Sequence, residues 1–328
     1  MRRREFLGVL GIAAALPVFA HAQQPERMRR IGVLWPFSAE DLRGKASLAA
    51  LKQGLLQLGW TDGRNLRVDA RWSTGELDDN RKNAAELVAL APDLIFASGS
   101  AAVGPLLQAT RTIPIVFAIV PDPVGAGYVA SLARPGGNAT GFTSFDYGIG
   151  AKWLELLKQV IPALTRVAVI RDPSVTAGIG QWGAIQATAP SFRVELSPIS
   201  VSDTAELENA IASFARGSNG GLIVTGSALA VVHRDLIVKL AARYKLPAVY
   251  YERYFVAAGG LVSYGPDYVD QYRQAATYID RILKGEKPSD LPVQTPIKYE
   301  LMINLQTAKA LGLTMPPSVL AQANEVIE

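Results

Sequence analysis

Two short triplets of small polar and glycine residues close apolar runs of this sequence in nearly the same way. They are Ser98-Gly99-Ser100 and Thr225-Gly226-Ser227. Each stands where a buried strand would end and a helix would begin. The N-terminus of a helix offers free backbone N–H groups and a partial positive charge, which suit a carboxylate or a phosphate. One such turn is most often a simple helix cap, but two matching turns favour a ligand held between them.

Aromatic and acidic side chains gather at the ends of the other apolar runs. The aromatic residues are Trp35, Phe37, Phe142, Phe145, Tyr147, Tyr250, Tyr251 and Tyr264. Aromatic walls with a few polar anchors are typical of a small-molecule cleft, although about half of these rings belong in the core. Asp122 and Asp267 are placed to meet a cationic group, and the alternative for each is a helix cap or a surface charge. A ligand carrying both a carboxylate and an ammonium would use both kinds of residue.

The usual catalytic signatures are missing from the sequence. Gly125 to Ala130 matches G-x-G-x-x-A, but it follows the fourth expected strand instead of the first, which argues against a dinucleotide site. The sequence has neither a P-loop nor a G-x-S-x-G turn, it has no cysteine, and His233 is the one histidine after residue 22. We therefore predict a protein that is not an enzyme, with no metal and no cofactor.

Short apolar runs alternate with amphipathic stretches along most of the chain. The expected strands are 30–35, 66–72, 93–97, 113–120, 139–143 and 166–170, and the expected helices are 46–58, 77–90, 101–110, 124–133, 152–160, 267–283 and 304–311. Such alternation predicts an α/β fold with parallel sheets built from right-handed β-α-β units.

The second half of the sequence repeats the order of the first. Residues 166–170 resemble 30–34, residues 222–228 resemble 94–101, and residues 246–249 resemble 113–116. The pattern favours two lobes of one design over a chance likeness of apolar strands. We predict an N-terminal lobe over 23–143, a C-terminal lobe over 144–266, and a tail over 267–328 that crosses back between the lobes and closes a hinge.

The first 22 residues have the layout of a cleavable export signal. Three arginines precede an apolar run from Phe6 to Ala20, and Ala20-His21-Ala22 is a signal-peptidase pattern. The run is shorter than the roughly 20 apolar residues that a membrane span needs. Arg3-Arg4 before Phe6-Leu7 resembles a twin-arginine signal, and an arginine-rich general-secretion signal is the alternative.

Composition narrows the location and the partners. A cysteine-free chain has no disulfide and cannot carry a lipid anchor at the cleavage site, so we expect a free protein in the periplasm. The formal net charge of +4 over 328 residues is too small to suggest a nucleic-acid partner.

Several motifs together resemble one family of ABC-transporter substrate-binding proteins, the family that includes the tryptophan/tyrosine-type binding proteins. In the first half they are Pro114 to Phe117, Asp122-Pro123-Val124 and Arg134 to Gly141; in the tail they are Ile282 to Gly285, Leu291 to Gln294, Asn304-Leu305 and Ala308 to Leu313. The resemblance covers nearly all of the chain after the signal. It implies a type I periplasmic-binding-protein-like fold, in which two Rossmann-like lobes joined by a hinge close on a small ligand.

The resemblance also implies partners and a site. The protein would be the periplasmic solute-binding subunit of an ABC importer, a monomer that takes an amino acid or related carboxylate to an inner-membrane permease with its cytoplasmic ATPase. The ligand loops of the family fall here on Phe37, Ser38, Ser98, Gly99, Ser100, Asp122, Ser144, Thr225, Gly226, Ser227, Tyr251 and Asp267. A periplasmic sensor or interaction module, or an enzyme, on the same fold is the open alternative.

Overall fold

The computed structural model describes residues 28–36, 38–73, 77–173, 175–200 and 203–328 of the chain. The predicted export signal at 1–22 and the candidate ligand residue Phe37 lie outside the described residues. Among the helices that are described, every one is too short or too polar to span a bilayer.

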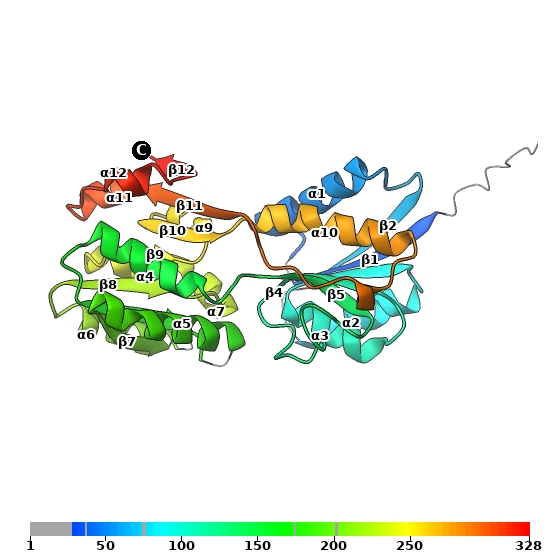
Figure 1. The fold of residues 1–328 in the computed structure, drawn as a ribbon, viewed down its shortest axis with the longest axis horizontal. Coiled ribbons are helices and arrows are strands. Elements are labelled where there is room, and N and C mark those ends of the chain that lie inside the picture. The colour runs from blue at the N-terminus through cyan, green and yellow to red at the C-terminus, as the bar shows by residue number, and fades with distance from the viewer. Residues whose placement is uncertain (1–27, 37, 74–76, 174, 201–202) are drawn as a thin grey trace, which may run out of the picture.

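One sheet of five parallel strands forms the core of the first lobe, here called the N-lobe. Its strands are β1 (Arg29–Trp35), β2 (Leu66–Trp72), β3 (Leu94–Ser98), β4 (Ile115–Val120) and β5 (Ala139–Thr143), in the order β2-β1-β3-β4-β5. The central strands are almost continuously buried, as expected for a sheet covered on both faces. In Figure 1, α1 (Leu42–Gln57) lies above this sheet, and α2 (Leu77–Ala89) and α3 (Ser100–Ala109) lie below it.

The second lobe, here called the C-lobe, is built on a sheet of seven strands. They are β6 (Arg166–Arg171), β7 (Glu195–Ser200), β8 (Gly220–Val224), β9 (Ala248–Tyr250), β10 (Val262–Pro266), β11 (Tyr299–Asn304) and β12 (Glu325–Ile327). Their order is β12-β11-β10-β9-β8-β6-β7, and only the pairing of β10 with β11 is antiparallel. Parallel sheets were predicted, so the antiparallel strand is a departure, which arises because β11 enters the sheet from the other lobe.

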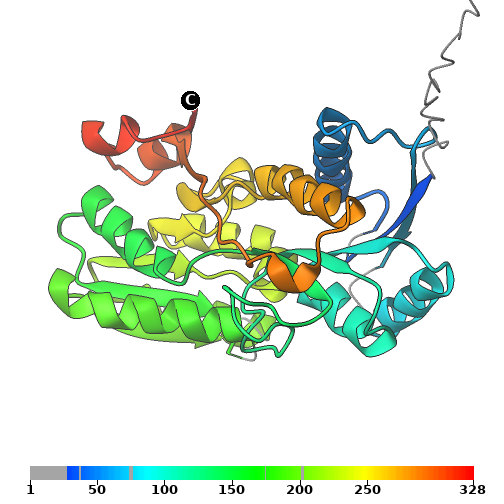
Figure 2. The ribbon, with the colours of Figure 1, turned by 45° about the vertical axis from the view of Figure 1, so that its right-hand side comes forward.

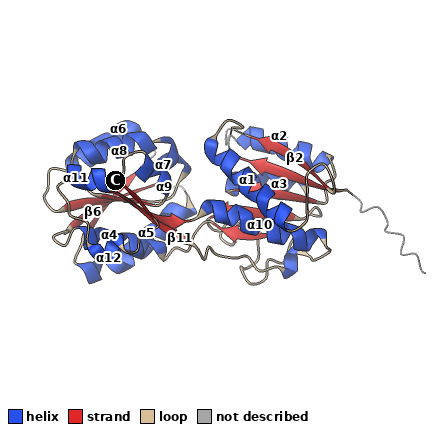
Figure 3. Ribbon diagram, turned by 90° about the horizontal axis from the view of Figure 1, so that it is seen from above, coloured by secondary structure: helices blue, strands red, loops and turns tan. Residues whose placement is uncertain are grey.

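Helices cover both faces of the C-lobe sheet (Figure 3). They are α4 (Ile149–Val160), α5 (Thr176–Phe192), α6 (Thr204–Phe214), α7 (Ala228–Val232), α8 (Arg234–Arg243), α9 (Arg253–Ala257), α11 (Leu305–Ala310) and α12 (Pro317–Leu320). α4, α5 and α12 lie on one side of the sheet in this view, and α6, α7 and α8 lie on the other. The remaining helices are α10 (Tyr268–Leu283) and the short 3-10 helix η1 (Pro288–Asp290), both outside this lobe.

The two sheets share one strand order. Strands β6 to β10 are arranged as β7-β6-β8-β9-β10, which repeats β2-β1-β3-β4-β5 position by position. The three sequence pairs that suggested a repeat correspond to β1 and β6, β3 and β8, and β4 and β9. The structure therefore supports the prediction of two lobes of one design.

Each lobe receives one helix from the other. The chain leaves β5 of the N-lobe and forms α4, whose Trp153 and Leu157 are buried in the C-lobe core. It leaves β10 of the C-lobe and forms α10, whose Tyr272 and Ile279 are buried in the N-lobe core. α10 and α1 touch closely at Gly54, where an added Cβ would lie 2.7 Å from the Arg273 carbonyl oxygen. Figure 2 shows α10 beside α1.

The helix predicted over residues 124–133 is wrong, because the structure has a series of turns there. The Asp122 carboxylate accepts a hydrogen bond from the Gly125 N–H at 2.7 Å, and Gly127 takes a positive φ of 70°. A carboxylate that bonds to a nearby backbone N–H competes with helix formation, and a left-handed glycine ends the turn.

Candidate ligand-binding site

The carboxyl ends of the strands are next to the segments that join the two lobes. The segment after β5 leads to α4, the single residue Asp267 joins β10 to α10, and residues 295–298 lead back to β11. Because neighbouring strands are parallel, the ends of β3, β4, β8 and β9 lie along the same edges as the ends of β5 and β10. Ligands of open α/β sheets bind at this edge.

The predicted site residues of the N-lobe are held by internal hydrogen bonds. Ser98 is buried, and its Oγ lies 2.8 Å from the hydroxyl of Tyr272 on α10, so its side chain is tied to that helix. Gly99 precedes α3 with a φ of 75° and has no side chain to cap the helix, and the carbonyl of Ser100 accepts a bond from Tyr128. Ser38 is exposed after β1.

The predicted residues after β8 are also engaged within their own lobe. The N–H and hydroxyl of Thr225 both donate to the Ile170 carbonyl, at 3.0 and 3.1 Å. Ser227 caps α7 by accepting from the Ala230 N–H at 3.0 Å. The Gly226 N–H donates to Oε1 of Gln181 at 2.9 Å. The backbone donor that the sequence assigned to a ligand carboxylate is therefore already bonded to a side chain.

Gln181 is a residue that the sequence analysis did not identify. It lies inside α5, is fully buried, and reaches the end of β8 only because α5 packs on the sheet there. No local motif marks it. Its Nε2, which carries two N–H donors, has no hydrogen-bond partner among the described residues.

Aromatic rings surround the Gly226 turn. A Cβ placed on Gly226 would lie 3.3 Å from the Tyr251 ring and 3.6 Å from the Phe145 ring. Tyr251 is buried at the end of β9 and meets Phe255 edge-on, with 5.6 Å between ring centroids. Phe145 in turn meets Tyr147 at 5.8 Å. Phe145 and Tyr147 of the first joining segment, with Tyr251 after β9 and Phe255 of α9, form an aromatic wall beside the turn.

The first joining segment, residues 144–148, touches both lobes. The Ser144 N–H donates to the Val120 carbonyl at 3.0 Å, and the Ser144 carbonyl accepts from Nε2 of Gln271 on α10 at 3.2 Å. The next ring, Phe145, lies against the C-lobe. The Ser144 hydroxyl and Oε1 of Gln271 have no hydrogen-bond partner within the part of the chain that the structure describes, and both residues are buried.

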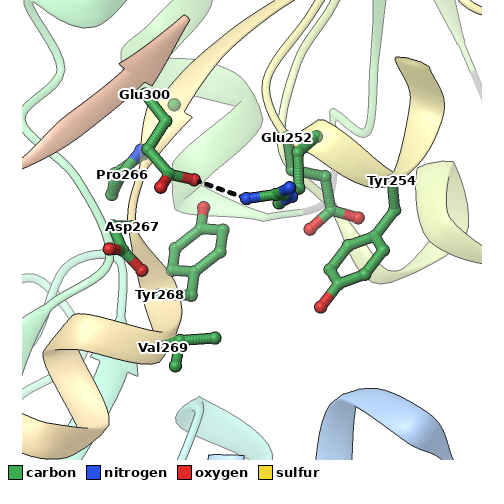
Figure 4. A pocket seen from close by; sticks show the side chains of 9 residues that line it. Glu252, Tyr254, Pro266, Asp267, Tyr268, Val269 and Glu300 are labelled. Atoms are coloured by element: carbon green, nitrogen blue, oxygen red, sulfur yellow. Dashed lines mark hydrogen bonds and ion pairs between the residues drawn. The ribbon is translucent and has the colours of Figure 1, made fainter. Parts of the chain in front are cut away.

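A solvent-open depression lies where α9, β10, β11 and the start of α10 meet (Figure 4). It is lined by Glu252, Arg253, Tyr254, Gly265, Pro266, Asp267, Tyr268, Val269 and Glu300. Arg253 forms ion pairs with Glu300, at 3.1 Å, and with Glu325. Lys298 pairs with Asp267 at 2.6 Å. Arg253, which lines the depression, and Lys298, the partner of its lining residue Asp267, are thus both paired with carboxylates of the protein.

Asp267 is held in its charged form. Burial of the carboxyl group raises its pKa, but hydrogen bonds from Lys298 and from the Asp270 N–H, with the charges of Lys298 and Arg273, outweigh burial and bring the pKa below its usual value. The same carboxylate caps α10 by accepting from the Asp270 N–H at 3.0 Å. Burial, with a smaller contribution from the charge of Glu252, raises the pKa of Tyr268 well above its usual value, so that hydroxyl stays protonated.

Within the described ranges, no group of three or more His, Asp or Glu side chains lies close enough together to hold a metal ion. The site instead consists of amide, hydroxyl and aromatic groups with a few paired charges. Groups of these kinds can bind and orient a small molecule. The absence of a metal and a cofactor remains a prediction.

Comparison with known proteins agrees with this reading of the fold. Residues 31–327 match the family model of the ABC transporter substrate binding protein. The chain is 31% identical over 271 residues to a tyrosine-binding protein of Clostridioides difficile, which covers 81% of this chain and 78% of that protein.

Two solved structures give the same picture. An ABC domain in complex with L-Trp from Streptococcus pneumonia is 26% identical with a TM-score of 0.82, covering 91% of this chain and 99% of that one. A conserved domain protein from Vibrio cholerae is 27% identical with a TM-score of 0.82, covering 92% and 100%. The expected fold, two Rossmann-like lobes of the type I periplasmic-binding-protein kind, is confirmed. The chain belongs to the family of ABC transporter substrate-binding proteins.

Proposed function

We propose that the protein is the solute-binding subunit of an ABC importer and that its ligand is an aromatic amino acid such as tryptophan or tyrosine. The observation that carries the proposal is the meeting of two matched sets of strand ends at one hinge, with aromatic rings and hydrogen-bonding groups beside them. The relatives that bind tyrosine and L-Trp support the choice of ligand. The ligand would be passed to a permease driven by a cytoplasmic ATPase.

The proposed site keeps the twelve residues predicted from the sequence. Phe37 and Tyr251 act as walls, and the Gly-Ser turns at 98–100 and 225–227 line the side of the cleft where the carboxylate lies. Asp122 and Asp267 place negative charge near the ammonium, with Ser38 and Ser144 as further hydrogen-bonding groups. The lobes are proposed to span 23–143 and 144–266, and the tail 267–328 is proposed to close the hinge by crossing to the N-lobe and back.

The proposed location is the periplasm. Its support is the signal-like pattern of residues 1–22, which would leave a mature chain beginning at Gln23. Without a cysteine at the cleavage site this mature chain would be free of lipid, and it would act as a monomer that diffuses between the membranes.

Calorimetry on the mature protein tests the ligand class. L-tryptophan, L-tyrosine and L-phenylalanine are titrated in turn, with L-leucine and L-arabinose as controls. A true ligand at 100 times its Kd should also stabilise the fold by about 2.7 kcal/mol. Saturable binding of an aromatic amino acid, with none of arabinose, supports the proposal. No heat and no thermal shift with any of the three would refute the aromatic amino-acid assignment.

A further inference from the structure

The fold buries two glutamine side chains at the hinge, each with one end of its carboxamide bonded and the other end unbonded. Gln181 is fully buried, and its Oε1 accepts the Gly226 N–H at 2.9 Å. Gln271 is 3% exposed, and its Nε2 donates to the Ser144 carbonyl at 3.2 Å. The ends that remain without a partner among the described residues are Nε2 of Gln181 and Oε1 of Gln271.

These two free ends are chemically complementary to a zwitterion. A carboxamide nitrogen can only donate, and a carboxamide oxygen can only accept. Nε2 of Gln181 therefore suits a carboxylate, and Oε1 of Gln271 suits an ammonium. The bonded end of each glutamine fixes which atom points which way, so neither amide can turn over without losing an existing hydrogen bond.

The Gly226 turn shows why a glutamine is needed on the C-lobe. All the donors of Thr225 go to the Ile170 carbonyl, and the Gly226 N–H goes to Gln181. Thr225 and Gly226 therefore have no donor left for a ligand. The donor that remains beside them is Nε2 of Gln181. Rings of the aromatic wall pack on both partners, since Tyr147 lies over Gly180, the neighbour of Gln181, and Tyr251 lies over Gly226.

Gln271 has the corresponding place at the hinge. It follows Asp267 by one helical turn at the start of α10, and the Gln271 N–H donates to the Asp267 carbonyl at 3.2 Å. Its contact with Ser144 ties α10 to the first joining segment. An ammonium at this position would have the negative charge of Asp267 nearby and the Gln271 oxygen as a direct acceptor.

We propose that Gln181 and Gln271 are ligand-contacting residues, with Nε2 of Gln181 donating to the carboxylate of the amino acid and Oε1 of Gln271 accepting from its ammonium. This inference rests on the proposed function and names recognition groups that it does not contain. A buried donor or acceptor without a partner destabilises the protein. Binding of a zwitterion relieves that cost at both glutamines, so it favours the arrangement in which the lobes hold the ligand.

The test compares ligands that lack one charged group. L-tryptophan carries both groups, tryptamine lacks the carboxylate, and indole-3-propionate lacks the ammonium. Gln181→Glu keeps an oxygen for the Gly226 N–H and replaces the donor with an acceptor, and the neutral Gln181→Asn withdraws the amide by one methylene. Each should weaken L-tryptophan and indole-3-propionate by roughly 10- to 100-fold, the effect of one hydrogen bond to a charged group, and leave tryptamine within about threefold.

Gln271→Met should show the opposite selectivity. L-tryptophan and tryptamine lose affinity by roughly 10- to 100-fold, and indole-3-propionate keeps its affinity, because the ammonium contact is the one ligand contact that is removed. The substitution also removes the hydrogen bond to the Ser144 carbonyl, whose loss would affect all three ligands alike. Matched controls are Gln186→Glu, on the exposed face of α5, and Gln274→Met on α10, which should bind all three ligands like the unsubstituted protein. Circular dichroism and thermal unfolding identify any variant that fails to fold.

The outcomes separate this inference from the proposed function. If the unsubstituted protein binds no aromatic amino acid, the proposed function fails and the inference fails with it. If it binds L-tryptophan and folded Gln181 and Gln271 variants bind all three compounds equally well, only the inference is overturned. Equal losses for all three compounds would mean that the glutamines act through the structure alone, which also overturns it. The inference is supported if the Gln181 variants lose affinity only for the ligands that carry a carboxylate and the Gln271 variant loses affinity only for those that carry an ammonium.

Discussion

Asp267 has two structural partners at the start of α10, and they make its effect on stability depend on pH. The carboxylate accepts the Asp270 N–H and pairs with Lys298. Its pKa in the folded protein lies below the usual value, so its contribution is complete above about pH 4 and is lost as the pH falls through the folded-state pKa.

Asp267→Asn should separate these two contacts, because asparagine still caps a helix but cannot form the ion pair. Lys298 is 53% exposed, so solvent screening limits the loss to about 1 kcal/mol or less at pH 7. Urea unfolding at pH 7, 5 and 3 is the measurement, with Lys298→Met as the partner variant. The deficit should shrink toward pH 3, and a deficit of equal size at pH 7 and pH 3 would contradict the assigned ion pair.

The residue types in the sequence predicted where the turns lie, but they did not predict which hydrogen-bonding atoms of those turns are available to a ligand. Serine and threonine at the ends of β3 and β8 indicated caps and ligand-facing turns, and Ser227 does cap α7. The types do not reveal that Ser98 bonds to Tyr272 or that Gly226 bonds to Gln181, since these partners are 174 and 45 residues away in the chain. Such contacts follow from how helices pack on sheets, which a local pattern does not contain.

At the scale of elements, α5 offers a matched pair of glycines on one helix. An added Cβ on Gly178 would lie 2.1 Å from the Asp172 carbonyl oxygen, whereas Gly183 has nothing within 4 Å of that position. Because Gly178 has no side chain, the N-terminal half of α5 can pack closely against the end of β6. The same closeness brings Gln181 to Gly226.

Gly178→Ala should destabilise the protein by about 1–3 kcal/mol, because backbone must move to admit the methyl group. Gly183→Ala should stabilise it by up to about 1 kcal/mol, because alanine is the better helix former at an exposed position. The free energy of unfolding of both variants, measured by denaturant titration, tests this prediction. The packing described for α5 would be wrong if the two substitutions had effects of the same sign.

Regular elements followed from the sequence where apolar periodicity was strong. β2 has the predicted bounds, α2 ends one residue earlier than predicted, and α3 begins and ends one residue earlier than predicted. The prediction failed at 124–133, where apolar residues occur at helical spacing but Asp122, Gly125 and Gly127 form turns. It also left out the antiparallel pairing of β11, because the direction of a strand depends on where the chain re-enters the sheet.

At the scale of the molecule, the exchange of helices makes the two lobes depend on one another. α4 packs in the C-lobe core although it follows β5 of the N-lobe. α10 packs in the N-lobe core although it follows β10 of the C-lobe. The order of strands in the sequence suggested two lobes, but the exchange could not be read from periodicity. Because three segments join the two lobes in one region, we expect the lobes to move relative to each other by bending about that region, as two-lobed proteins do when they close around ligands.

Labels on the two lobes should report that bending directly. Val124 follows β4 and is 40% exposed, and Val232 ends α7 after β8 and is 74% exposed, so both stand at the strand-end edges of their lobes. The chain has no cysteine, so Val124→Cys with Val232→Cys gives two clean attachment points for spin labels. Closure on L-tryptophan should shorten the distance between the labels in pulsed electron spin resonance.

A pair within the N-lobe, Leu56→Cys with Val124→Cys, should show no change, since one lobe moves as a rigid body. Saturating ligand that binds but leaves the Val124–Val232 distance unaltered would show that binding does not require closure, and it would place the ligand within a single lobe.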